Sequence, residues 1–171
     1  NNILICDPKI YIFQMIKNII FDFGGVLIPI DESSTKQSFN DLGSKKELSE
    51  QIEIFHSVEK GLISSNEFLT KIQPFFFRKI FKPELAKAWN AMLKPLPAER
   101  KNFLKRLKKD YRIFLLSNTN ELHINHIKEV AGRFEYKQFY SQFDKVYYSH
   151  EVGMRKPDAE IFEMVLKEND L

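Results

Sequence analysis

Three short apolar segments, each followed by polar residues and a helical pattern, constrain the fold of this chain most strongly. The segments are Ile19–Phe21, Ile113–Leu116 and Val146–Tyr148. The first consists of consecutive bulky apolar residues, which predicts a strand buried on both faces, as in parallel sheets. The alternation of strand and helix predicts an α/β fold with a doubly wound parallel, Rossmann-like sheet.

A long helical block interrupts this alternation between the first and second strands. Residues 32–94 show apolar residues at helical spacing and no clear strand, and two Ser-x-x-Glu patterns predict capping boxes at Ser44 and Ser64. The block falls inside the first crossover, which places it over the carboxyl ends of the strands, where a lid belongs. We therefore predict a core from residues 15–31 and 95–171, and a helical cap from residues 32–94. Residues 1–14 are interpreted as an N-terminal extension, with an edge strand as the alternative.

Composition describes a soluble globular protein. The 171 residues are 43% hydrophobic and 29% charged, with a net charge of +3. No apolar run could span a membrane, and the basic residues between 100 and 109 predict a solvated helix face, so we expect neither a membrane nor a nucleic-acid partner. Cys6 is the only cysteine, which excludes an intramolecular disulfide and favours a cytoplasmic location. The oligomeric state is not predicted.

Polar residues follow the strands where ligands bind in an open parallel sheet. Asp22 follows the first strand, Ser117 and Asn118 end the second, and Lys156 lies in the loop after the third. The carboxyl ends of parallel strands share one crevice, so these residues are expected to converge. Asp22 could attack phosphorus, Ser117 and Asn118 could hold phosphate oxygens, and Lys156 could offset the negative charge. A turn, a helix cap and a surface charge are the ordinary alternatives for these residues.

The motifs resemble those of the haloacid dehalogenase (HAD) superfamily. Phe21-Asp-Phe-Gly-Gly-Val-Leu27 is similar to its first motif, Leu115-Leu-Ser-Asn-Thr-Asn120 to its second, and Gly153-Met-Arg-Lys-Pro-Asp158 to its third. The residues of the second and third motifs are especially similar to those of the bacterial alpha-D-glucose-1-phosphate phosphatase branch. The resemblance implies a phosphatase that acts on a small phosphorylated metabolite through an aspartyl-phosphate intermediate. It also implies Mg²⁺, with Asp22 as nucleophile and metal ligand and the Gly24 carbonyl as a second ligand.

The chain departs from the family pattern at two places. Gly24 stands where most phosphatases of the superfamily carry a second Asp as general acid and base, so that role is unassigned. The family's fourth motif, an acidic pair ending a further strand, has no counterpart before Leu171. We therefore expect a sheet that is incomplete at the C-terminus, weak Mg²⁺ binding and poor activity. The acids near the C-terminus are expected on a helix or its tail: Asp158, Glu160, Glu163, Glu168 and Asp170.

Several alternatives remain open. The segment Ile3–Asp7 could occupy the place of the missing strand. His123 and His126 could bind a metal, although no third ligand is evident. A Ser117-based triad lacks the Gly-x-Ser-x-Gly elbow. Two further functions would be consistent with the absence of the fourth motif's acidic pair. One is a dehalogenase-type hydrolase that needs no metal, and the other is an inactive binding relic of the fold.

Overall fold

The sheet has three parallel strands in the spatial order β1-β2-β3. The computed structural model describes residues 16–171, so the predictions for Ile3–Asp7 and residues 1–14 lie outside the described residues. The strands are β1 (Asn18–Phe21), β2 (Arg112–Ser117) and β3 (Lys145–Tyr148). Phe21 pairs with Leu115, and Ser117 pairs with Tyr148, so the carboxyl ends of the strands lie together. The three predicted strands are confirmed.

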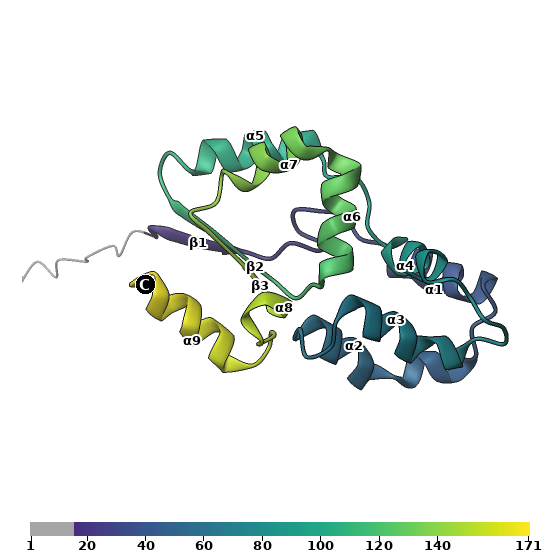
Figure 1. The fold of residues 1–171 in the computed structure, drawn as a ribbon. Coiled ribbons are helices and arrows are strands. Elements are labelled where there is room, and N and C mark those ends of the chain that lie inside the picture. The colour runs from purple at the N-terminus through teal and green to yellow at the C-terminus, as the bar shows by residue number, and fades with distance from the viewer. Residues whose placement is uncertain (1–15) are drawn as a thin grey trace, which may run out of the picture.

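Helices cover both faces of this sheet (Figure 1). One face carries α5 (Ala98–Leu107), α6 (Glu121–Ala131) and α7 (Arg133–Tyr140), and the other carries α8 (Ser149–Val152) and α9 (Ala159–Glu168). The alternation of side chains along β2 explains the two layers. Ile113 and Leu115 pack with the first group of helices, whereas Leu116 packs with Ile161 and Val165 of α9. The doubly wound arrangement is thus confirmed.

Strand β1 lies at an edge of the sheet within the described residues. It pairs with β2 on one side, and Ile20 remains 37% exposed. The expectation that Ile19–Phe21 is buried on both faces is therefore wrong at Ile20. The reason is that a strand with a single neighbour in the sheet is covered less completely than a central one such as β2, where five of six residues are buried.

The chain between β1 and α5 is helical and has an apolar cluster of its own. Its elements are α1 (Glu32–Asp41), η1 (Lys46–Glu50), α2 (Ile52–Glu59), α3 (Ser65–Ile72), η2 (Gln73–Phe75) and α4 (Lys82–Asn90). Phe68, Ile72 and Leu85 are fully buried in this cluster. These helices lie at one end of the molecule, beside the core (Figure 1). We call residues 32–94 the helical insertion; that it acts as a cap stays a prediction.

The two connections between the core and the insertion run side by side. Two backbone hydrogen bonds join them, from Asp31 N to Met92 O (2.8 Å) and from Lys94 N to Pro29 O (3.1 Å), and together they form the antiparallel bridge between Ile30 and Leu93. The insertion therefore leaves and re-enters the core at one place. None of the helices within residues 16–171 has the length and apolar character needed to cross a membrane.

One predicted capping box is confirmed and the other is wrong. The Ser64 hydroxyl accepts from the Glu67 backbone N–H, and the Glu67 carboxylate accepts from the Ser64 backbone N–H, at the start of α3. Ser44 caps no helix, because η1 begins only at Lys46 and Ser44 instead forms an isolated bridge with Phe76. The local pattern was overridden there by a contact between distant parts of the insertion.

Candidate active site

Asp22 lies directly after β1, at the start of a tight loop. Its Oδ1 accepts a hydrogen bond of 2.6 Å from the Phe23 backbone N–H, and its side chain is about half exposed, at 48%. The loop then folds back on itself, because the Phe23 carbonyl accepts from the N–H groups of Leu27 (2.9 Å) and Ile28 (3.0 Å). Gly25 has a φ of +74°, a conformation that other L-residues rarely adopt, which explains the glycine there. The loop thus presents the Asp22 carboxylate beyond the strand end.

Asn118 joins the end of β2 to the loop that carries Lys156. The Asn118 side-chain N–H donates to the Lys156 carbonyl (2.8 Å), and the Asn118 side-chain oxygen accepts from the Lys156 backbone N–H (2.8 Å). An Asn side chain carries both a donor and an acceptor, so one amide can bond both backbone groups of a single residue in this way. The pair of bonds fixes the backbone of Lys156 against the sheet.

The Lys156 ammonium reaches the Asp22 carboxylate. Its Nζ lies 2.8 Å from Asp22 Oδ1 and donates to the Leu116 carbonyl at 2.9 Å. The Lys156 side chain is 20% exposed, so the ion pair is partly withdrawn from water, where charged groups interact more strongly. Three segments that are distant in the sequence therefore meet at the carboxyl end of the sheet.

Ser117 is placed differently from the other predicted site residues. It is 2% exposed, and its hydroxyl donates over 3.4 Å to the Asn118 carbonyl. Within residues 16–171 it makes no hydrogen bond to Asp22 or Lys156. Direct contacts thus join Asp22 to Lys156 and Lys156 to Asn118, whereas the Ser117 hydroxyl contacts only Asn118 among these residues.

Two supporting residues of this region were not singled out from the sequence. The buried Ser149 hydroxyl accepts from the Thr119 backbone N–H (2.9 Å) and donates to the Thr119 carbonyl (3.0 Å), which ties the loop after β2 to the start of α8. Asn120 caps α6, because its side-chain oxygen accepts from the His123 backbone N–H (3.1 Å). The sequence signal for Ser149 is its place directly after β3, at the same level as Asn118 after β2.

The sequence of this region also matches the model of a known protein family. The sequence model of the haloacid dehalogenase-like hydrolases matches residues 16–169. The chain belongs to this family. The membership covers all three strands and both loops that meet at Asp22, and it confirms the resemblance predicted from the motifs. The narrower resemblance to glucose-1-phosphate phosphatases stays a prediction.

Relatives within the haloacid dehalogenase-like hydrolases are similar over most of their length. A D-ribitol-5-phosphate phosphatase from Bacteroides thetaiotaomicron is 32% identical over 160 residues, which cover 91% of this chain and 78% of the relative. A HAD family enzyme from the same organism, solved as an aspartate-to-alanine variant with magnesium and inorganic phosphate, is 31% identical with a TM-score of 0.82, and the match covers 92% of this chain and 80% of that chain. A predicted HAD-like hydrolase from Porphyromonas gingivalis is 31% identical with a TM-score of 0.77, and covers 92% and 78% of the two chains.

The donor atoms near Asp22 fit a hard cation such as Mg²⁺, which prefers oxygen ligands. Both contacts to Asp22 go to Oδ1, and Oδ2 makes no hydrogen bond or ion pair within residues 16–171. The Gly24 carbonyl likewise accepts no hydrogen bond from the described residues, because the Phe23 and Ile28 carbonyls make the bonds of this loop. Two oxygen donors, two residues apart in this loop, thus have no partner among the described residues, and a substrate phosphate with waters could supply the other ligands.

No larger cluster of metal-binding side chains accompanies these donors. Residues 16–171 contain no group of three or more His, Cys, Asp or Glu that could hold a metal. His123 is only 9% exposed and stacks on Trp89, so it is buried where the helical insertion meets the core and is not a surface histidine. Four of the C-terminal acids lie where they were predicted, Glu160, Glu163 and Glu168 within α9 and Asp170 beyond its end, whereas Asp158 precedes the helix at its N-cap.

Proposed function

We propose that this chain is a phosphatase that hydrolyses a small phosphorylated metabolite. The observation that carries the proposal is the contact between Lys156 Nζ and Asp22 Oδ1, with Asn118 holding the Lys156 peptide. A carboxylate beside a fixed ammonium suits the attack on an anionic phosphate ester, because the ammonium offsets the charge of both groups. The names of the relatives, a ribitol-5-phosphate phosphatase and a HAD enzyme with magnesium and phosphate, support the same conclusion.

In the proposed reaction Asp22 is the nucleophile. A carboxylate oxygen of Asp22 attacks phosphorus while the bond between phosphorus and the ester oxygen breaks. The alcohol leaves with a proton, and an aspartyl-phosphate forms on Asp22. Water then attacks that phosphorus, which releases inorganic phosphate and restores the carboxylate. Gly24 offers no side chain for the proton transfers, so a water or a residue of the helical insertion serves as acid and base.

Lys156 and the loop after β2 hold the transferred group in this scheme. The Lys156 ammonium neutralises oxygens of the phosphoryl group, and Ser117 and Asn118 hold phosphate oxygens with their side chains or N–H groups. Mg²⁺, held by Asp22 and the Gly24 carbonyl, would supply positive charge for the phosphate oxygens. The helical insertion acts as the cap that excludes bulk water and selects the substrate. We assign the protein to the cytoplasm, on the basis of its single cysteine.

The test is a measurement of phosphate release with and without MgCl₂ from D-ribitol 5-phosphate, glucose 1-phosphate, a simple aryl phosphate and a phosphopeptide. We expect turnover of a small polyol or sugar phosphate that requires Mg²⁺ and disappears in Asp22→Asn, whose fold is checked by circular dichroism. Preference for the phosphopeptide would contradict the cap. Halide release from a 2-haloacid without phosphate release would establish the dehalogenase alternative instead. A folded protein without turnover of any compound would favour the binding relic.

A further inference from the structure

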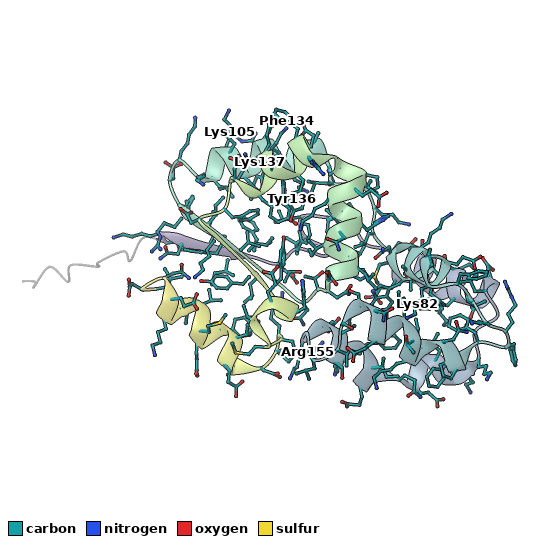
Figure 2. The ribbon with its side chains drawn as sticks, in the orientation of Figure 1. Lys82, Lys105, Phe134, Tyr136, Lys137 and Arg155 are labelled. Carbon is teal, nitrogen blue, oxygen red and sulfur yellow. The ribbon has the colours of Figure 1, made fainter. Side chains whose placement is uncertain are left out.

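The end of α2 contacts the loop that carries Lys156. The Glu59 carboxylate oxygen Oε2 accepts from Arg155 Nε at 3.1 Å and lies 3.0 Å from Arg155 Nη2. The two side chains are 24% and 19% exposed, respectively, so this ion pair is largely covered. Arg155 is labelled beside the end of α2 in Figure 2, where the helical insertion meets the core. A partly buried Arg–carboxylate ion pair with a charge-assisted hydrogen bond restrains the two backbone segments that carry it.

Lys60, the residue directly after α2, makes a second ion pair with the same loop. Lys60 Nζ lies 3.0 Å from Asp158 Oδ2, with side chains 32% and 42% exposed. Arg155 and Asp158 stand on either side of Lys156 in the sequence. The two ion pairs therefore bracket the residue whose ammonium meets Asp22.

The following residue, Gly61, presses against the backbone of α8. A Cβ built on Gly61 would lie 2.1 Å from the His150 carbonyl oxygen, and the φ of Gly61 is +65°. Only a glycine allows the chain to approach so closely. This steric contact is independent of the two ion pairs, and it joins the same stretch of the insertion to the segment between β3 and Lys156.

We propose that Glu59, Lys60 and Gly61 form a clamp that positions Lys156 beside Asp22. The Asn118 side chain holds the backbone N–H and carbonyl of Lys156, and the clamp holds Arg155 and Asp158, which lie one residue before and two residues after it. The ammonium then stays in place only while the insertion rests on the core, so movement of the insertion changes the site itself. Glu59 and Arg155 are thus positioning residues that act through Lys156. Their effect on turnover rests on the proposed phosphatase function, whereas their effect on the loop does not.

The test compares Glu59→Gln with the matched control Glu135→Gln. Glu135 makes an ion pair of 2.6 Å with Lys101 between α5 and α7, on the other side of the sheet from α8 and α9. The first readout is amide hydrogen exchange at Lys156, whose N–H is bonded to Asn118 Oδ1. We expect roughly tenfold faster exchange in Glu59→Gln, with unchanged exchange in β2 and no effect of the control, because local opening raises exchange only where the contact is lost.

The second readout is steady-state kinetics on a substrate that the protein hydrolyses. We expect about a tenfold loss of kcat with a smaller change in KM, because misplacement of a charged group costs more in the transition state than in the bound substrate. The double variant Glu59→Arg with Arg155→Glu should restore slow exchange and part of kcat. Unchanged exchange at Lys156 in Glu59→Gln, or an equal rise in the control, would overturn the clamp. Faster exchange in a protein without turnover would support the clamp and refute the phosphatase proposal.

Discussion

The indole ring of Trp89 stacks on the imidazole ring of His123, with centroids 5.0 Å apart and planes inclined by 20°. The contact joins α4 of the helical insertion to α6 of the core. Asn120 strengthens it, because its side-chain oxygen lies within reach of both the Trp89 indole N–H (3.4 Å) and the His123 backbone N–H (3.1 Å). Burial lowers the pKa of His123 to about 4, although a hydrogen bond with the Trp89 backbone acts in the opposite direction.

We expect the free energy of unfolding to fall as the pH falls from about 6.5 to about 4. The unfolded chain binds a proton at His123 more readily than the folded chain does, so acid favours unfolding in this window. The shift corresponds to about 3 kcal/mol across the window. Urea unfolding at pH 7 and pH 4 measures it. In His123→Phe, which can keep the stack, most of this pH dependence should vanish; His150, whose pKa burial also lowers, leaves a remainder. An equal pH dependence in both proteins would contradict the assignment.

Replacement of Lys156 by Met removes the ammonium beside Asp22. We expect kcat/KM to fall by roughly a hundredfold or more, because the charge that stabilises the phosphoryl group in the transition state is lost. Affinity for inorganic phosphate, measured by calorimetry, should fall as well. Lys145→Met is the control, because Lys145 also pairs with a carboxylate, that of Glu168, but on the surface. Similar activities of the two variants would remove Lys156 from the site.

Gly61→Ala should destabilise the protein more than Gly43→Ala does. Both glycines have positive φ values, +65° and +83°, so both variants carry backbone strain of about 1–3 kcal/mol. An added Cβ at Gly43 meets only the ring of Phe77 at 3.9 Å, whereas at Gly61 it meets the His150 carbonyl at 2.1 Å. The difference between the two unfolding free energies isolates this steric contact. Equal losses of unfolding free energy in the two variants would show that Gly61 can move away from the His150 carbonyl without a loss of stability.

Phe68→Ala and Leu104→Ala test the division into a core and a helical insertion. Each side chain is fully buried, Phe68 in the insertion's cluster and Leu104 in the core cluster. Each truncation should cost about 2–5 kcal/mol, through lost burial and the cavity left behind. If the two parts are separate units, Phe68→Ala should speed amide exchange in α3 and α4 but leave β2 protected. Faster exchange throughout both parts would mean that the chain unfolds as one unit.

Local patterns in the sequence were enough to predict much of the fold and the candidate site. Short apolar runs predicted the three strands. The rule that parallel strands share a carboxyl end predicted that Asp22, Ser117, Asn118 and Lys156 converge, and all but Ser117 are joined through Lys156. The structure adds how they meet: the Asn118 amide bonds the backbone N–H and carbonyl of Lys156, and the Lys156 ammonium reaches the Asp22 carboxylate. Those bonds depend on side-chain directions that spacing alone does not specify.

What the sequence by itself determined is the order of strands and helices and the chemical groups at the strand ends, because both follow from contacts between near neighbours in the chain. Only the tertiary structure decided that Ile20 lies at an exposed edge, that His123 is buried under Trp89, and that Glu59 meets Arg155. These are contacts between segments far apart in the sequence. They depend on how the helical insertion rests on the core, and no periodicity within either segment carries that information.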